Sequence, residues 1–210
     1  LAEAMSKHGL DKRFALGILR MKFVGKSTGR ILFTFGAITA FISMWISNTA
    51  AAAMMLPIAV GIVGSVAKIA GEEKGRKIDV RKFRFGTAMM LMTAYSASIG
   101  GIGTPVGTPP NLIGIAMIEK FAGLRISFFE WLMFALPMLV IMYVFLFLLI
   151  YFLNKPEVSG LKISDSFVSS SKHDLGKMKR GEINSMIAFF ITVALWIIPG
   201  FIAVIYGTES

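Results

Sequence analysis

The chain has 210 residues, of which 55% are hydrophobic, and its mean hydropathy of +0.71 lies far above that of a soluble domain. Its formal net charge of +10 could suggest a nucleic-acid partner, but the basic segments lack the interleaved aromatic residues of a protein that reads bases. The absence of cysteine excludes disulfides, thiolate metal sites and cysteine nucleophiles. These properties predict an all-α polytopic membrane protein with no nucleic-acid partner.

The positive charges are distributed unevenly along the chain. Seven Lys and Arg residues lie in residues 1–30, six in 71–84 and six in 155–182, whereas the connection 119–130 holds two. Cytoplasmic loops carry an excess of Lys and Arg, so this distribution predicts that the first three segments face the cytoplasm and the fourth faces outward. We expect a multi-pass protein of the cell (inner or plasma) membrane, with anionic lipid in contact with its basic loops.

Residues 1–30 mix apolar and basic side chains, which predicts an interfacial or arm-like helix. Residues 31–70 carry only one charge, Lys68, and are interrupted by Ser47, Asn48 and Thr49. Two full spans would have the same topology as a hairpin. The interruption lacks charge, Gly and Pro, however, so we favour a re-entrant hairpin whose tip is buried in protein, where non-helical backbone is tolerated at membrane depth.

A basic cytoplasmic loop is expected at 71–84, followed by a broken transmembrane helix at 85–122. Between Gly100 and Pro110 lie four glycines and three prolines, a density that no continuous helix tolerates. The first half-helix is predicted to end near Ser98 and Ile99. Counting from the preceding arginine, this break and the Ser-Asn-Thr tip lie equally far along the chain, so we expect them at similar depth.

The remaining hydrophobic runs, 128–153 and 183–206, are each long enough to cross the hydrocarbon core as simple helices, joined by a cytoplasmic linker at 154–182. Glu130 and Trp131 are interpreted as an interfacial anchor without chemistry. The opening sequence has no signal-peptide pattern, and we expect the chain to be an internal part of a larger protein.

The two interruptions offer complementary groups. A new half-helix is predicted to follow Thr49 and another to follow Thr108, and helix N-termini favour anions. The preceding half-helices, the first predicted to end at Trp45 and Ile46, leave carbonyl oxygens unpaired, which suit a hard cation. Ser43, Ser47 and Asn48 add side-chain oxygens, and the two serines would share a face if helical. Without Lys or Arg nearby, a bound anion needs co-bound cations, and broken helices of this kind occur in secondary transporters.

Two segments, FISMWISNTAAAAMMLPIA and SASIGGIGTPVGTPPNLIG, resemble the signature segments of the divalent anion:sodium symporter family, whose members carry dicarboxylates, citrate or sulfate. The resemblance implies Na⁺ as coupling ion, an elevator-type transport domain and a homodimer in the complete protein. Family members contain two inverted repeats, and this chain resembles most of the first. The candidate residues are Ser43, Ser47, Asn48, Gly100, Gly101, Gly103 and Thr104 for sodium; Asn48, Thr49, Thr104 and Thr108 for substrate; and Gly107, Pro109, Pro110 and Asn111 for the structural break.

We favour Na⁺-coupled carriage of a small divalent anion, such as the C4-dicarboxylate succinate, and no enzymatic activity, because the hydrophobic runs hold no buried Asp, Glu or His that could serve as base or nucleophile. Three alternatives remain open. The protein could be an anion exchanger, an H⁺-coupled carrier, or a non-transporting membrane subunit in which Ser-Asn-Thr is only a helix cap and the glycine-proline run only a packing notch.

Overall fold

The computed structural model describes residues 7, 13, 27–74, 83–156 and 178–206. Its described part contains six helices and no strand, which confirms the predicted all-α class. The predicted arm helix falls almost wholly outside the described residues, as do most of the basic loop and the linker. The helices are α3 (Thr28–Ser43), α4 (Asn48–Lys74), α5 (Arg84–Ile102), α6 (Pro109–Ala122), α7 (Phe128–Leu153) and α9 (Arg180–Tyr206).

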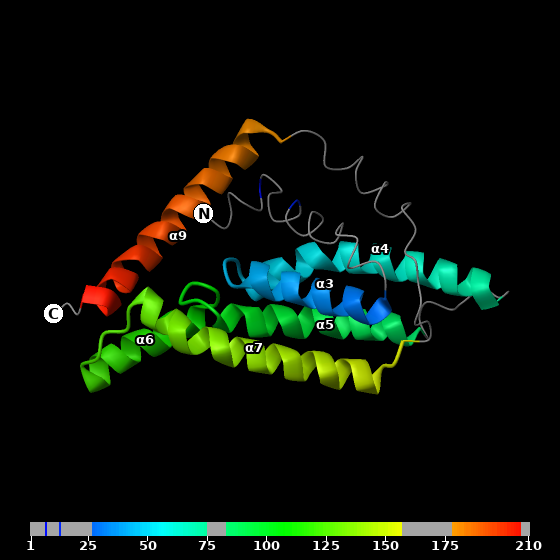
Figure 1. The fold of residues 1–210 in the computed structure, drawn as a ribbon, viewed down its shortest axis with the longest axis horizontal. Helices are drawn as coiled ribbons and strands as arrows, with labels where there is room; N and C mark the ends of the chain where they lie inside the picture. Colours follow the sequence, from blue (N-terminus) through cyan, green and yellow to red (C-terminus); the bar gives the residue numbers. More distant parts are fainter. Residues whose placement is uncertain (1–6, 8–12, 14–26, 75–82, 157–177, 207–210) are drawn as a thin grey trace.

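Helix α5 is the centre of a bundle, because α3, α4 and α7 all pack against it (Figure 1). The core between these helices contains fully buried Leu32, Phe35, Met89 and Met92. Gly36 of α3 lies against Met92, and a Cβ at this position would come within 2.4 Å of its Cε atom. The glycine therefore lets α3 approach α5 closely.

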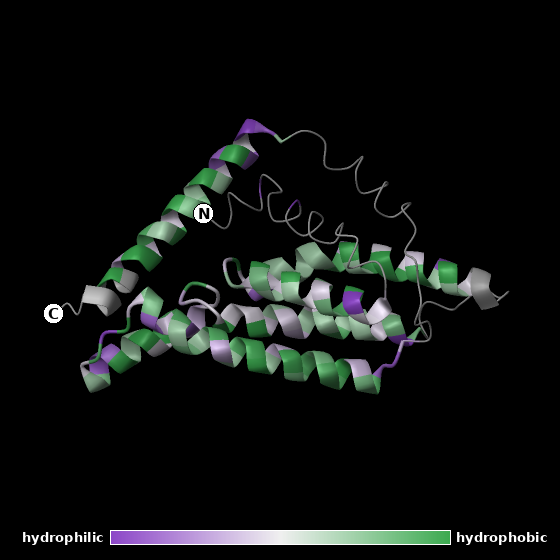
Figure 2. Cartoon of the chain, in the orientation of Figure 1, coloured by the Kyte–Doolittle hydropathy of each residue, from purple (hydrophilic) through white to green (hydrophobic). Residues whose placement is uncertain are grey.

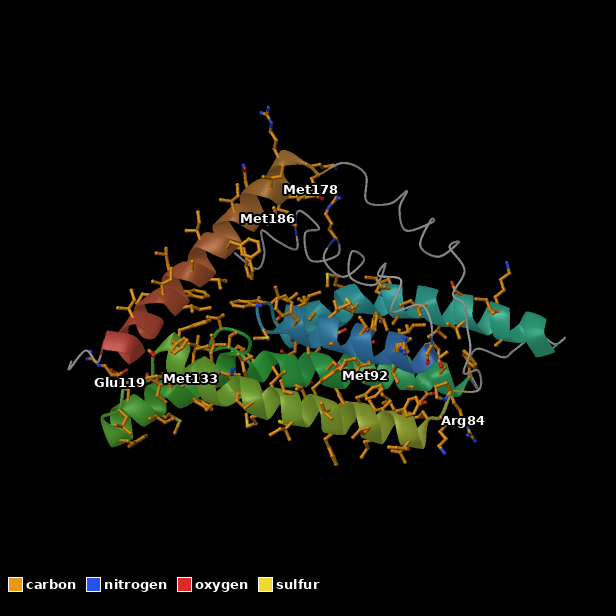
Figure 3. All side chains as sticks on the ribbon, viewed as in Figure 1. Arg84, Met92, Glu119, Met133, Met178 and Met186 are labelled. Atoms are coloured by element: carbon orange, nitrogen blue, oxygen red, sulfur yellow. The ribbon has the colours of Figure 1, made fainter. Side chains whose placement is uncertain are left out.

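Three helices have the length and apolar composition to cross a membrane: Asn48–Gly71 of α4, α7, and Arg180–Pro199 of α9. Helix α3 has 16 residues and is about 24 Å long, which is short of a hydrocarbon core of about 30 Å. Hydrophilic residues gather at the ends of the helices (Figure 2). Arg84 and Glu119 lie at opposite ends of the bundle (Figure 3).

The hairpin of α3 and α4 has its tip at the same end of the bundle as the break after α5 (Figure 1). Helix α9 stands at an angle to the bundle and meets it near this tip. There the ring of Trp45 lies edge-on to Phe189, with centroids 5.0 Å apart, and is stacked on Phe128. Aromatic packing thus joins the first interruption to α7 and α9.

Candidate functional site

The first interruption is a short turn at residues 44–47. Helix α3 ends at Ser43, not at Trp45 and Ile46 as predicted, because the next backbone bonds tighten: the amide of Trp45 donates to Ile42 O at 3.0 Å, a 3₁₀-type bond. Ser47 consequently lies outside α3, so the condition under which Ser43 and Ser47 would share one helical face is not met.

Helix α4 begins at Asn48, two residues before Ala50, where it was predicted to start after Thr49. Ser47 occupies the preceding position, where its Oγ accepts a hydrogen bond of 3.3 Å from the amide of Ala50. Its carbonyl also accepts from the amide of Ala51 at 2.9 Å. Ser47 is therefore the N-cap of α4 in geometry and chemistry, since a serine at this position satisfies amides that the helix itself leaves unpaired.

The second interruption runs from Gly103 to Thr108. Helix α5 continues through both glycines to Ile102, three residues beyond the predicted end, and the amide of Gly103 closes it by donating to Gly100 O at 2.9 Å. Both glycines lie within the helix, and the lack of a side chain lets α5 pack closely against α3: a Cβ on Gly100 would lie 2.1 Å from Ala40 O. Thr108 has extended backbone immediately before Pro109.

The two interruptions meet. Thr104 is fully buried, and its Oγ1 donates a hydrogen bond to the carbonyl of Met44 in the first turn. Gly107 lies against the same carbonyl, since a Cβ added there would be 3.1 Å from Met44 O and 2.6 Å from Gly101 O. The backbone of one break is thus the packing surface of the other, as the expectation of similar depth requires.

Three oxygens converge where α3, α4 and α5 meet. Ser43 Oγ, which is fully buried, lies 2.7 Å from Ala97 O and 2.9 Å from Asn48 Oδ1. A hydroxyl has one proton, so it can donate to only one of these two acceptors at a time. Gly101 borders the cluster, because a Cβ there would lie 2.1 Å from Asn48 Oδ1. We refer to Ser43 Oγ, Asn48 Oδ1 and Ala97 O as the oxygen cluster.

The start of α4 presents backbone N–H groups, which attract anions, whereas the oxygen cluster attracts cations. The amides of Asn48 and Thr49 form no hydrogen bond within the described residues, and a helix N-terminus carries partial positive charge. Asn48 and Thr49 also line a groove of about 490 Å³ between α4 and α5, whose opposite wall includes Thr93, Ala97 and Ser98. An anion placed at this end of the groove would lie beside the oxygen cluster.

The start of α6 is less suited to an anion than the sequence suggested. Pro109 and Pro110 carry no amide hydrogen, and the amide of Asn111 donates to Thr108 O at 3.1 Å. Free amides are what make a helix N-terminus attractive to an anion. Of the two N-termini, only that of α4 therefore offers consecutive free amides at its first positions.

The carbonyls of the second interruption are largely occupied. Asn111 Nδ2 donates to Gly101 O and to Thr104 O, both at 2.8 Å, and the indole Nε1 of Trp131 donates to Ile102 O at 3.0 Å. Trp131 is buried and bonded to the end of α5, so its interpretation as an interfacial anchor is wrong. These oxygens already act as acceptors, although a carbonyl keeps a second lone pair.

Sequence reasoning placed Ser43 and Asn48 correctly beside one another in space but missed Ala97. A backbone carbonyl has no residue signature, and the only available signal was position: Ala97 lies one turn before Gly101 on the same helix. The described residues contain no group of three or more His, Cys, Asp or Glu side chains. The three atoms of the oxygen cluster that could bind a cation are neutral oxygens, which suit an alkali cation better than a transition metal.

Comparison with known proteins fits this geometry. The model of the family described as "Sodium:sulfate symporter transmembrane region" matches residues 1–208. The chain belongs to this family. Membership confirms the resemblance inferred from the two motifs, and with the apolar helices it supports a multi-pass membrane protein.

The chain is also similar to curated proteins named "Sodium-dependent dicarboxylate transporter SdcS". The protein of Staphylococcus saprophyticus is 34% identical over 204 residues, and that of Staphylococcus aureus strain USA300 is 31% identical over 203 residues. Each alignment covers 96% of this chain and 38% of the relative. The chain therefore spans about two fifths of the length of these relatives.

Proposed function

We propose that this chain provides a cation site and an adjoining anion site for the Na⁺-coupled transport of a small divalent anion, with a C4-dicarboxylate such as succinate as the favoured substrate. The relatives' names supply the dicarboxylate and the sodium dependence. The observation that carries the proposal is the convergence of Ser43 Oγ, Asn48 Oδ1 and Ala97 O directly beside the free amides of α4.

The proposed coupling between cation and anion binding follows from the lack of charged side chains in the segments that form the site. From Ile31 to Ala67 and from Phe85 to Ile118 the chain has no charged side chain, so neither ion has a fixed counter-charge in these segments. A helix N-terminus supplies only about half a positive charge, which does not neutralise a dianion. A monovalent cation in the oxygen cluster would raise the local positive charge to about +1.5, which offsets most of the charge of a dianion, and the anion would in turn favour the cation. Binding of each ion therefore strengthens binding of the other.

Depth in the membrane can be judged against α7. Trp131 bonds Ile102 O, and a Cβ on Gly103 would lie 2.8 Å from Leu139, so the breaks are level with the first three turns of α7. Leu139 lies 11 residues, or about 16 Å, into that helix. If α7 spans the bilayer from its outer end, the site lies between the outer boundary and the midplane, inside the hydrocarbon region.

Topology and assembly complete the proposal. We place the basic loops in the cytoplasm and the protein in the cell membrane, and we interpret α3 and α4 as a re-entrant hairpin. The short α3 supports this interpretation for the first arm of the hairpin, because it does not reach across the hydrocarbon core, whereas Asn48–Gly71 of the second arm is long enough to cross it. We further propose that the site described here is the first of two half-sites in a homodimeric protein.

The first test is uptake of labelled succinate by protein expressed from its full reading frame and reconstituted in liposomes. We expect uptake to fall to background when choline replaces Na⁺. Undiminished uptake would remove the Na⁺ coupling and leave the H⁺-coupled carrier or the exchanger, which a pH gradient and preloaded unlabelled succinate would separate.

The second test asks whether the interruption binds substrate at all. Asn48→Ala removes one oxygen of the cluster, and we expect it to abolish anion binding while the protein remains folded. Unchanged succinate binding would favour the non-transporting subunit.

A further inference from the structure

The end of α5 is held by side chains from two other helices. Asn111 is the buried residue of α6, 8% exposed, and both of its Nδ2 hydrogens are used on carbonyls of the break. Trp131 of α7 is 9% exposed, and its one donor group is used on the carbonyl between them in sequence. The carbonyls of Gly101, Ile102 and Thr104 thus receive three hydrogen bonds from side chains outside α5.

These bonds do more than satisfy the helix end. Carbonyls at a helix C-terminus can be satisfied by a tightened turn or by water, and neither fixes their position relative to other helices. Here the donors are on rigid side chains with few rotatable bonds, and they come from two different helices, α6 and α7. The orientation of the last turn of α5 is therefore set by α6 and α7.

The last turn of α5 is also the wall of the oxygen cluster. Gly101 has no side chain, and its Cα lies close to the amide group of Asn48. A Cβ added at Gly101 would lie 2.1 Å from Oδ1 and 2.9 Å from Nδ2 of Asn48. Ala97 O, a cluster member, lies one turn earlier on the same helix. A small rotation of this turn would change both the distance from Asn48 to Gly101 and the direction of Ala97 O.

We propose that Asn111 and Trp131 are positioning residues for the oxygen cluster, acting on it through the backbone of α5 rather than by touching an ion. The proposal rests on the proposed function for the identity of the ion as Na⁺. It predicts that removing a donor from either residue lowers the affinity for Na⁺ and loosens the loop after α5, while leaving every atom of the cluster in the protein.

The cleanest variant is Trp131→Phe, which removes the N–H donor and keeps an aromatic ring. Trp196→Phe is its matched control, because the Trp196 ring packs at a tilt against Phe128 but its indole makes no hydrogen bond within the described residues. Asn111→Leu removes both amide donors and keeps the number and branching of the side-chain heavy atoms. Leu112→Ala is its control, since Leu112 is the next residue on α6 and is 51% exposed.

Two readouts separate positioning from folding. The chain has no cysteine, so a single Val106→Cys substitution allows a spin label to be placed on the exposed loop between α5 and α6. Its nanosecond mobility reports the loop with or without Na⁺. The Na⁺ concentration at half-maximal thermal stabilisation reports the cluster. Both are measured on protein from the full reading frame, with the unfolding temperature in the absence of Na⁺ as a check on folding.

We expect Trp131→Phe and Asn111→Leu to raise the half-maximal Na⁺ concentration about fivefold to tenfold, in keeping with one or two lost hydrogen bonds. Both should mobilise the label, and both controls should do neither. A more mobile label with an unchanged Na⁺ dependence would overturn the positioning role. Unchanged label mobility would overturn the claim that Asn111 and Trp131 hold the loop after α5. If the parent protein responded to no Na⁺ concentration, the proposed function would fail, whereas label mobility would still show whether the two donors hold the loop.

Discussion

The two interruptions of this bundle both lie in uncharged sequence but differ in how their backbone is satisfied. At the first, α3 ends and α4 begins within four residues, and the amides of Asn48 and Thr49, which form no hydrogen bond among the described residues, lie beside a groove. At the second, six residues separate α5 from α6, the carbonyls of α5 are bonded by Asn111 and Trp131, and α6 opens on two prolines. The first break presents binding groups, and the second forms a rigid wall behind them.

This difference teaches that a broken helix need not be a ligand site on both sides. Unpaired backbone groups inside a membrane are costly, so each must be bonded by protein, water or ligand. The second break solves the problem internally through side-chain donors. In the proposed function, the first leaves amides for an anion and the oxygen cluster for a cation, and the following predictions test that division from the largest expected effect to the smallest.

Gly101→Ala should have the largest effect. The added Cβ would come within 2.1 Å of Asn48 Oδ1 and push that side chain out of the oxygen cluster. Forcing a methyl group into packed structure typically costs about 1–3 kcal/mol, so we expect Na⁺-driven uptake to fall about tenfold to a hundredfold. Gly114→Ala, where nothing lies within 4 Å, is the control and should retain normal uptake. Normal uptake by Gly101→Ala would show that the contact between the breaks is dispensable.

Thr104→Val tests the hydrogen bond that joins the second interruption to the first. The substitution keeps the shape of the side chain, removes the hydrogen bond to Met44 O and leaves that carbonyl without this donor. We expect a loss of unfolding free energy of about 1–3 kcal/mol, seen as a lower unfolding temperature in detergent. Thr192→Val should change stability little, since that hydroxyl bonds the carbonyl of Ala188 in its own helix. Equal stabilities for the two variants would contradict the assigned role of Thr104.

Ser43→Ala tests the cation side of the first break. It removes the hydroxyl that lies between Ala97 O and Asn48 Oδ1, and we expect the Na⁺ concentration at half-maximal uptake to rise about threefold to tenfold, with succinate binding at saturating Na⁺ unchanged. Ser65→Ala serves as the control, because Ser65 Oγ bonds Gly61 O within α4 and Ser65 does not line the groove. An unaltered Na⁺ requirement in Ser43→Ala would exclude this oxygen as a ligand.

Substitutions of Ser47 should have the smallest effect. They test whether its hydroxyl only caps α4 or also binds the cation. As the N-cap of α4 it contributes about 0.5–1 kcal/mol, so Ser47→Ala should lower the unfolding temperature slightly, and Ser47→Gly should lower it less. If the hydroxyl is only a cap, neither variant will change the Na⁺ requirement at 25 °C. A Na⁺ requirement that rises equally in both variants would instead restore Ser47 to the cation site.

Much of the fold could be predicted from the sequence because its causes are local. The long uncharged runs determine the helices, and the glycines and prolines between Gly100 and Pro110 determine the second break. Helix ends were missed by two or three residues, since bonds such as that from Trp45 to Ile42 depend on how the turn packs. Ala97 and Trp131 were missed for a related reason: one contributes a backbone atom, and the other acts through a partner 29 positions away.

The most direct test of the central claim is a disulfide between the two interruptions. The chain lacks cysteine, and a Cβ on Gly103 would lie 2.9 Å from Met44 Cγ, which brings the two Cβ positions close to the spacing of about 3.5–4.5 Å that a disulfide requires. In native membranes, protein carrying Met44→Cys and Gly103→Cys should cross-link rapidly with a mild oxidant, and the pair Met44→Cys and Gly114→Cys should not. Absence of the first cross-link, with both thiols free and the protein folded, would contradict the meeting of the two breaks.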